Sequence, residues 1–340
     1  MSILLIGVLG ALLASDQPAA LNKPVTQNTR AVSAIDTNNP VELELEKIEE
    51  EDDTAQAEVD GWIRENQEFA AKGAAIPNAE LNRRIRERFD SIRKGYEDFI
   101  HRHSDYAPAR VAYASFLDDI GQDDAGYEQL LKARDIDPKL PSVWNQLGNY
   151  YGENGPTTNA FVCYEKAIEL DPTESVYYHN FGTTVYLYRK DVREFYHLTE
   201  QQVFDKAMAL YAKAMAADPT NFDLATDVAQ SYYGIKPLRL NDALVAWTNA
   251  LKLAHDDIER EGVYIHFARI KMLAGEYALA HQQLDAVTNP MYVDMKRRVA
   301  RAIDQREHPE TNAPVAASPG SADVPPASSK ETPKPETNSP

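Results

Sequence analysis

A stretch of 34 residues in the middle of the chain, residues 141–174, carries aromatic, small and helix-breaking residues in a fixed order. Apolar residues recur at helical spacing on both sides of a break at Gly155, which indicates two helices. Gly148 is expected to face Ala160 where the helices approach most closely, and Pro172 ends the second helix. The ordered positions are Trp144, Leu147, Gly148, Tyr151, Gly155, Ala160, Tyr164, Ala167 and Pro172. A unit this small buries little apolar surface alone, so it predicts stacking on similar neighbours.

The same alternation of small and large residues recurs on both sides of this unit. The predicted units are 107–140, 141–174, 175–221, 222–256 and 257–289. The third contains an insertion, and the fifth lacks the closing proline. Residues 59–106 are predicted to form N-terminal helices or a partial repeat. Residues 290–307 form a predicted amphipathic helix whose apolar side closes the last unit.

This pattern resembles the tetratricopeptide repeat family at every position quoted for residues 141–174. The resemblance implies an all-α fold, a right-handed α-solenoid of antiparallel helix pairs from about Val59 to Glu307. It also implies that the first helices line a concave groove. The implied function is that of a non-enzymatic scaffold, which binds a peptide or a segment of a partner protein in this groove.

Carried over position by position, the resemblance places amides, phenols and other polar side chains in the groove. The candidate groove residues are Asn145, Asn149, His179, Asn180, Thr183, Tyr186, Gln230, Tyr233, His266 and Arg269. Other lining positions are occupied by Gln146, Glu153, Asp227 and Met272. Side-chain amides can pair with both N–H and C=O of a peptide backbone, which suits peptide capture. The alternative is that many of these residues simply solvate a concave surface.

The insertion of the third unit mixes aromatic rings with cations, a combination found at interaction surfaces. Arg189, Lys190, Arg193 and Phe195 form a candidate lip on the groove. A longer helix pair with an extended core is an equal alternative. Family members that clamp a C-terminal carboxylate have a lysine at the position of Asn145, so that ligand is not expected here.

The N-terminal region begins with an apolar run, residues 3–14, which has the length of a signal-peptide core. It is shorter than the ~20 residues of a membrane-spanning helix, so no stable membrane span is expected. Residues 1–20 are therefore predicted to be a signal peptide. The expected location is periplasmic or secreted, and otherwise cytoplasmic. A buried N-terminal helix or an uncleaved anchor is the alternative.

Residues 21–58 are predicted to form a flexible linker and an acidic arm. The acidic stretch could be a docking strip, but a frayed helix kept soluble by charge repulsion is the favoured interpretation. Arginines between residues 83 and 93 could form ion pairs with this acidic stretch. Residues 308–340 are rich in proline and serine and poor in large apolar side chains, which predicts a disordered tail.

Composition excludes several classes of protein. The formal net charge of −18 and the pI near 4.9 argue against nucleic acid as a partner. A single cysteine, Cys163, excludes a disulfide-rich scaffold and a cysteine-rich metal site. Phosphate-binding loops, zinc-protease motifs and nucleophile elbows are absent from the sequence, so we predict no catalytic residue, cofactor or metal. Paired acids such as Asp118 and Asp119 are expected to frame turns.

Two other functional classes stay open. One is a structural subunit that packs by its convex face into an envelope assembly. The other is a carbohydrate-binding or small-molecule-binding accessory to an enzyme, suggested only by the tyrosine, tryptophan and asparagine content.

Overall fold

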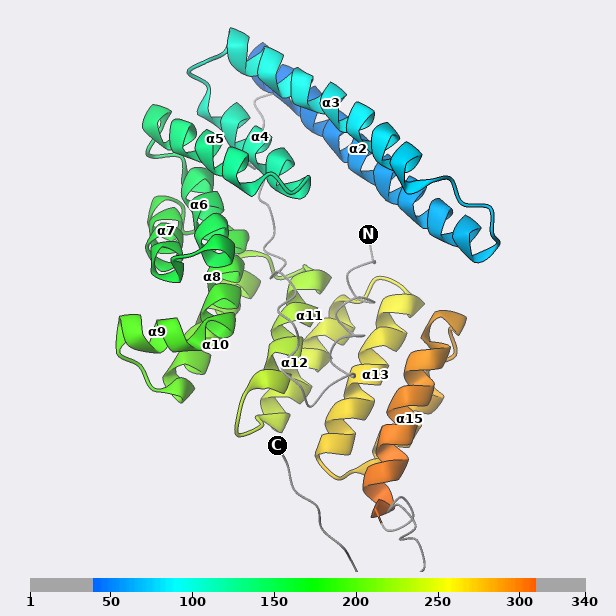
Figure 1. The fold of residues 1–340 in the computed structure, drawn as a ribbon. Helices are drawn as coiled ribbons and strands as arrows, with labels where there is room; N and C mark the ends of the chain where they lie inside the picture. Colours follow the sequence, from blue (N-terminus) through cyan, green and yellow to red (C-terminus); the bar gives the residue numbers. More distant parts are fainter. Residues whose placement is uncertain (1–38, 310–340) are drawn as a thin grey trace, which may run out of the picture. The chain divides into compact units, whose positions relative to one another are not determined.

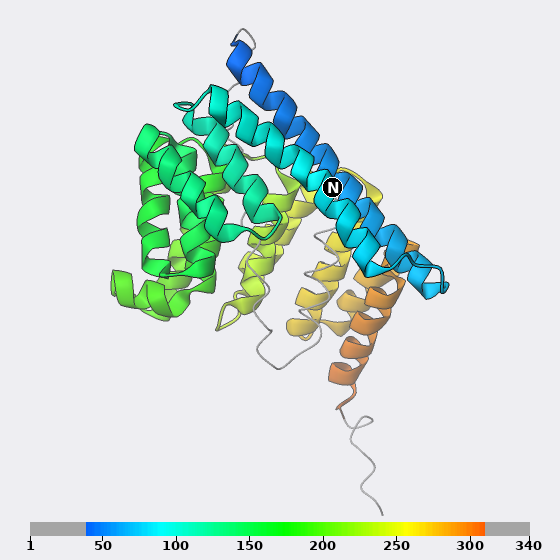
Figure 2. The same ribbon diagram turned by 45° about the horizontal axis from the view of Figure 1, so that its top comes forward.

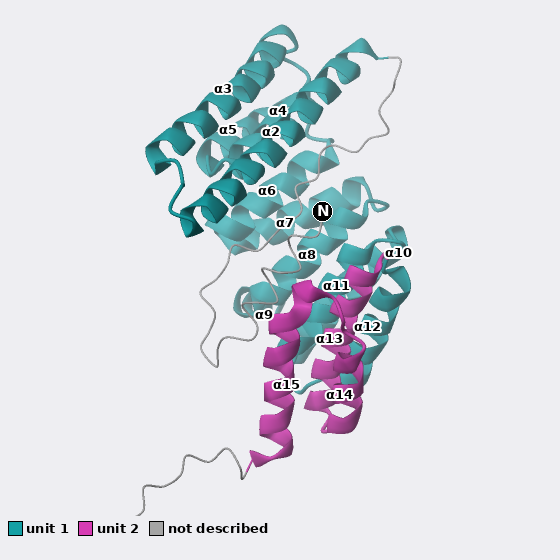
Figure 3. Ribbon diagram, turned by 90° about the vertical axis from the view of Figure 1, so that its right-hand side faces the viewer, with its two compact units in different colours: residues 1–254 teal, residues 255–340 magenta. Residues whose placement is uncertain are grey.

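The computed structural model describes residues 39–309, which contain helices and no β-strand (Figure 1). The chain divides into two compact units, residues 1–254 and 255–340 (Figure 3). The predicted signal peptide and nearly all of the predicted C-terminal tail lie outside the described residues. Among the described helices, none combines the length and the apolar character that a membrane span requires.

The first unit begins with a long hairpin of two antiparallel helices, α2 (Pro40–Ala71) and α3 (Asn78–Arg102), seen side by side in Figure 2. The side chain of Asn39 accepts a hydrogen bond from the backbone N–H of Val41, and Pro40 opens the first turn.

Charges of opposite sign hold the two helices of the hairpin together. Arg88 of α3 lies 2.9 Å from Glu51 and 2.7 Å from Glu58, and Arg102 lies 2.5 Å from Glu44. Residues 40–58, which were expected to be part of a flexible arm, therefore belong to a helix. The favoured interpretation was a frayed helix, whereas α2 is a continuous helix of 32 residues with Leu45, Asp52, Ala55 and Val59 buried.

Helix pairs follow the hairpin in the order that the repeat pattern predicts. The helices of the first unit are α4 (Ala107–Asp119), α5 (Asp123–Ile136), α6 (Pro141–Asn154), α7 (Thr157–Leu170), α8 (Ser175–Leu187), α9 (Arg189–Tyr196), α10 (Glu200–Ala217), α11 (Phe222–Ser231), the short 3-10 helix η1 (Tyr232–Gly234) and α12 (Leu240–Leu253). The packed pairs are α4 with α5, α6 with α7, α8 with α10, and α11 with α12. Each pair lies within one predicted unit.

The close approach of α6 and α7 is made by a glycine under a tyrosine ring. A Cβ atom on Gly148 would lie 2.6 Å from Cε1 of Tyr164, a residue with no exposed surface. Tyr164 is therefore the nearest neighbour of Gly148 and the ring that a side chain at this position would have to displace. In the next repeat, a Cβ atom on Gly182 would lie 3.0 Å from the ring of Tyr211.

We expect Gly148→Ala to lower the free energy of unfolding by about 1–3 kcal/mol, because the buried ring of Tyr164 has to move. Gly182→Ala should cost less, since the ring of Tyr211 needs to give way by only a few tenths of an ångström. Urea unfolding followed by circular dichroism measures both. Equal losses for the two variants would contradict the difference in contact distance.

The insertion of the third unit forms α9, a helix that packs on α7 and α10. Val192 is its buried residue, and the Phe195 ring lies 5.5 Å from the ring of Phe161 on α7. Because α7 and α10 are the second helices of their pairs, α9 extends the core on that side of the unit.

The second unit contains α13 (Asp257–Leu273), α14 (Tyr277–Asp285), the short 3-10 helix η2 (Pro290–Tyr292) and α15 (Val293–Glu307). Met295, Val299 and Ile303 of α15 are buried, as an amphipathic closing helix requires. The carboxylate of Glu261 accepts hydrogen bonds from Thr288 and Asn289 and so fixes the loop before η2. Burial alone would raise the pKa of Glu261, but these hydrogen bonds lower it.

Candidate functional site

The first helices of the repeats in the first unit are α4, α6, α8 and α11, and they carry most of the predicted groove residues. Asn145 and Asn149 lie on α6, and His179 and Asn180 lie on α8. All four side chains are buried. Thr183 on α8 and Gln230 on α11 are half-buried.

A chain of buried amide hydrogen bonds connects three consecutive first helices. Gln146 of α6 donates to the hydroxyl of Ser115 on α4 at 2.8 Å, and it accepts from Nδ2 of Asn149 at 2.7 Å. Nδ2 of Asn180 on α8 then donates to Oδ1 of Asn149 at 3.3 Å and to Oδ1 of Asn145 at 3.2 Å. These amides therefore bind one another and hold α4, α6 and α8 in register.

The second helix of the same repeat joins this chain. The Tyr164 hydroxyl on α7 donates to Oδ1 of Asn149 at 2.8 Å and accepts from Thr184 of α8 at 3.4 Å. Burial raises the pKa of Tyr164, so its hydroxyl keeps its proton and remains a donor.

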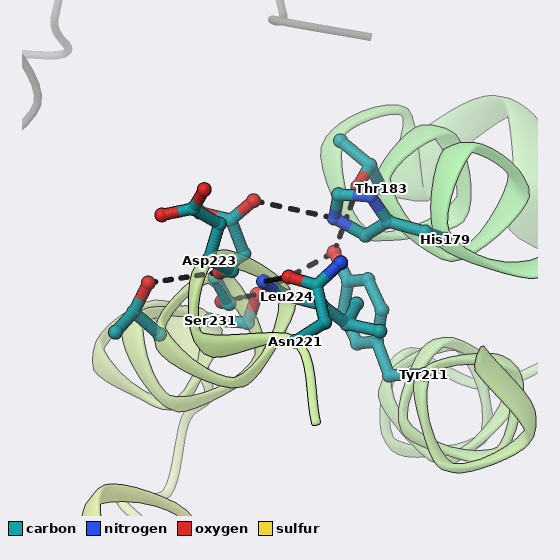
Figure 4. Close-up of polar contacts among 9 residues, drawn as sticks. His179, Thr183, Tyr211, Asn221, Asp223, Leu224 and Ser231 are labelled. Atoms are coloured by element: carbon teal, nitrogen blue, oxygen red, sulfur yellow. Dashed lines mark hydrogen bonds and ion pairs between the residues drawn. The ribbon is translucent and has the colours of Figure 1, made fainter. Parts of the chain in front are cut away.

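A second polar cluster connects α8 with α10 and α11 (Figure 4). Nε2 of His179 lies 3.3 Å from a carboxylate oxygen of Asp227, and Thr183 lies within hydrogen-bond distance of the Tyr211 hydroxyl, at 3.1 Å. The side chain of His179 is 4% exposed, whereas that of Asp227 is 49% exposed. Asp227 thus reaches a buried histidine while one side of its carboxylate faces solvent.

Tyr186 and Tyr233 sit beside the turn that follows α11. A Cβ atom at Gly234 would collide with the Tyr186 hydroxyl, so glycine is required there. The guanidinium of Arg189 lies 5.6 Å from the centre of the Tyr186 ring, and the Tyr233 ring lies 6.5 Å from that of Trp247. These tyrosines are half-buried and pack against their own unit.

His266 and Arg269 belong to α13 and therefore to the second unit. Both side chains are buried. Burial, assisted by the positive charge of Arg269, lowers the pKa of His266 well below its usual value, so the ring is neutral near pH 7.

The candidate lip residues lie on α9. Lys190 and Arg193 are exposed, and Phe195 is exposed at its edge while its ring contacts α7. The neighbouring Tyr196 donates to Glu165 at 2.7 Å, and the Lys206 ammonium lies 4.2 Å from the centre of the Tyr196 ring. α9 thus packs on the second helices and at the same time presents Lys190 and Arg193 to solvent.

Positive charge is distributed unevenly among the helices of the second, third and fourth pairs. The first helices α6, α8 and α11 contain no lysine or arginine. Their acidic residues are Glu153, Asp223 and Asp227, and each is at least partly exposed. The lysines lie instead on the second helices, as Lys166 on α7, Lys206 and Lys213 on α10, and Lys252 on α12. Among the first helices, α6 and α11 thus carry acids without cations, α8 carries neither acids nor lysine or arginine, and α4 carries Arg110.

A small cavity lies among α4, α5 and α6. Its lining residues are Ala114, Ser115, Asp118, Asp123, Gly126, Tyr127, Leu130, Gln146, Asn149, Tyr150 and Glu153. Sequence reasoning assigned Asp118 to a turn and missed the cavity, because its walls come from three helices that are distant along the chain. The acidic residues near the ends of α4 and α6 are the sequence feature that could have indicated this cavity.

The described residues bring together one cluster that has the donor types of a metal site. Nε2 of His281 on α14 lies 3.4 Å from Asp304 and 3.7 Å from Glu307, both on α15. All three side chains are at least partly exposed, and exposed groups of these types are often close together without a metal ion.

Comparison with known proteins identifies one repeat by sequence and similar folds among solved structures. Residues 141–174 match the family model of the tetratricopeptide repeat. PilW, a widely conserved type IV pilus biogenesis factor, has a similar fold with a TM-score of 0.50 and 13% identity, over 72% of this chain and 97% of that chain.

Two other solved structures resemble this chain. PilF of Pseudomonas aeruginosa is 14% identical, with a TM-score of 0.48, over 74% of this chain and 98% of that chain. YrrB, a TPR protein with an unusual peptide-binding site, is 13% identical, with a TM-score of 0.45, over 62% of this chain and 97% of that chain. The recognition of a tetratricopeptide repeat is confirmed: residues 141–174 are such a repeat, within an all-α array of helix pairs.

Proposed function

We propose that the first unit is a non-catalytic interaction scaffold that holds an extended segment of a partner protein against the first helices of its repeats. The tetratricopeptide repeat at residues 141–174 supports this role, because such repeats generally serve as protein-binding scaffolds. The observation that carries the proposal is the uniform chemistry of α6, α8 and α11. None of the three contains a lysine or an arginine, and α6 and α11 add the carboxylates of Glu153, Asp223 and Asp227.

The buried hydrogen bonds beneath this face prepare it for binding. The amide chain fixes α4, α6 and α8 relative to one another, and the pair of His179 and Asp227 connects α8 to α11. A surface that is already ordered loses little conformational entropy when a ligand binds. A partner segment can therefore cross several first helices without rearranging them.

Among the predicted groove residues, Thr183, Tyr186, Gln230 and Tyr233 retain some exposed surface and remain proposed contacts. Asn145, Asn149, His179 and Asn180 act in this proposal by shaping the face from below. The lip on α9 is the competing site, with Arg189, Lys190, Arg193 and Phe195 as its contacts. Export, expected from the apolar run at residues 3–14, stays a prediction.

The proposal is tested by carboxylate footprinting of the complex isolated from the native host. Labelling of exposed carboxylates with an amine and a carbodiimide should fall several-fold at Glu153, Asp223 and Asp227 when the partner is bound. Glu169 on α7 and Glu194 on α9 are exposed and should label equally in the free and bound protein.

Protection of Glu194 alone would instead identify the insertion as the binding site and contradict the proposal. Protection of Glu169 alone would place the partner on the second helices and would contradict it as well. Mass spectrometry of the labelled peptides separates these patterns without knowledge of the partner's sequence.

A further inference from the structure

A second hollow of the first unit lies where the end of α3, the loop that follows it, α4 and α5 meet. It measures about 420 Å³, a size typical of pockets that hold small molecules. Arg110 of α4 is the one residue of its lining with a permanent positive charge. The ligand chemistry of the hollow therefore depends on how this charge is balanced.

The positive charge of Arg110 has no carboxylate partner among the described residues. Nη1 donates to Oε1 of Gln129 at 2.9 Å, and Nη2 donates to the backbone carbonyl of Ser104 at 3.4 Å. Both acceptors are neutral, and the second bond is long. Nε is buried and has no hydrogen-bond partner in the described part of the chain. A guanidinium has five N–H groups, so most of its capacity to donate is unused.

Glu97 is the only acid of the lining, and a different residue binds it. The Tyr113 hydroxyl donates to Oε1 of Glu97 at 2.9 Å. Burial, together with this bond, raises the pKa of Tyr113 to about 12, so the hydroxyl keeps its proton and remains a donor. Glu97 is thus held by a neutral phenol, and the charge of Arg110 remains uncompensated.

These groups favour a carboxylate over other anions. A planar carboxylate matches the planar guanidinium, which can donate two parallel hydrogen bonds to it. A phosphate can carry two negative charges, and the second one would meet Glu97 without a second permanent cation in the lining. Ile100 and the ring of Tyr113 add apolar surface, which suits an organic acid with an apolar body.

We propose that this hollow binds an organic carboxylate, with the carboxylate on Arg110 and the apolar body against Ile100 and Tyr113. The site is separate from α6, α8 and α11 and does not depend on the function proposed for them. Two sources offer this chemistry, a free small molecule and an acidic side chain of a partner protein. The experiment below distinguishes them.

The test uses the full chain and fluorine NMR of three probes of similar shape: para-fluorobenzoate, para-fluorobenzamide and para-fluorophenylphosphonate. The carboxylate should bind at least about tenfold more tightly than the neutral amide, because only the carboxylate forms charged hydrogen bonds with Arg110. It should also bind more tightly than the phosphonate, whose second charge lies near Glu97.

Gln129→Glu is the most informative variant, because it places a carboxylate beside Arg110 and leaves Arg110 intact. Oε1 of Gln129 already accepts from Nη1, so the new carboxylate should neutralise the guanidinium from the same position. We expect para-fluorobenzoate to bind about tenfold more weakly or less. Arg110→Gln removes the cation itself and should have the same effect.

The matched control is Arg86→Gln, which removes one positive charge from α3. Arg86 is exposed and lies outside the lining of the hollow. Because solvent screens a charge at this distance, the control should change the affinity less than about twofold. Circular dichroism of all variants checks that the helices are intact.

Equal binding of the carboxylate and the amide would overturn the inference, and so would unchanged binding by Gln129→Glu. Displacement of para-fluorobenzoate by acetylglutamate amide would support the site and identify an acidic side chain of a partner as its ligand. A lack of displacement, with the preference for the carboxylate intact, would support the site and identify a free small molecule.

Discussion

Replacing Tyr164 with alanine should lower the free energy of unfolding by about 3–5 kcal/mol, the range measured when large buried aromatic side chains are truncated. Tyr164 has no exposed surface, and its ring fills the space above Gly148. Truncation therefore leaves a cavity between α6 and α7. It also removes the hydroxyl that donates to Asn149. Urea unfolding of the full chain, followed by circular dichroism, measures the loss.

Tyr164→Phe is the matched variant, because it keeps the ring and removes only the hydroxyl. We expect it to cost about 1–2 kcal/mol, the penalty for an incompletely satisfied buried acceptor. The difference between the two variants measures the packing of the ring. If Tyr164→Ala unfolded at the same urea concentration as the wild type, the assignment of this ring to the contact between α6 and α7 would be wrong.

The repeat spacing in the sequence is sufficient to predict the helix pairs of the first unit. Prolines at the ends of the repeats determine where helices begin and end. Gly148 and Gly182, each with an aromatic residue on the following helix, determine where the helices touch. These are local signals, and they recur every repeat. The helices from α4 to α14 accordingly lie within the predicted units.

Contacts between particular side chains were harder to predict. The offsets of Gly148 and Ala160 indicate that the two helix faces meet, but the rotamer of Tyr164 decides which atom lies over the glycine. Similarly, the acidic composition of residues 41–60 predicts at most a frayed helix, because like charges repel one another. In the structure, Leu45 and Ala55 of α2 pack in one apolar cluster with residues of α3, and Arg88 and Arg102 of α3 pair with acids of α2.

In the candidate site too, the repeat pattern predicts which helix face a residue occupies but not which side chains it contacts. Position in the repeat predicts that Asn145, Asn149 and Asn180 lie on the inner face of the first helices. It does not predict that these amides bond to one another, because that depends on the spacing between adjacent repeats. The cavity lined by Asp118, Asp123 and Glu153 has the same origin, since each acid comes from a different helix.

Asn149→Ala provides the clearest test of whether these amides serve the fold or the ligand. If Asn149 were only a groove residue that contacts a peptide, this change would weaken peptide binding and leave folding nearly unchanged. In the structure, Asn149 accepts from Tyr164 and Asn180 and donates to Gln146. We therefore expect Asn149→Ala to lower the free energy of unfolding by about 3 kcal/mol, because several buried polar groups lose a partner at once.

The control is Asn154→Ala on the same helix. Asn154 is exposed, and its side chain donates only to the backbone carbonyl of Tyr150, at 3.2 Å. Its removal should change the free energy of unfolding by less than about 0.5 kcal/mol, as is usual for exposed positions. The two variants remove the same side-chain atoms, one from the interior of α6 and one from its last residue.

Measuring unfolding and partner binding on the same samples then separates the two roles of Asn149. A loss of stability that exceeds the Asn154 control by more than about 2 kcal/mol identifies the amide chain as the element that aligns α4, α6 and α8. Any weaker binding would then follow from displaced helices. If Asn149→Ala were as stable as the control yet bound the partner less tightly, Asn149 would contact the ligand directly, and the buried hydrogen bonds would have to open in the complex.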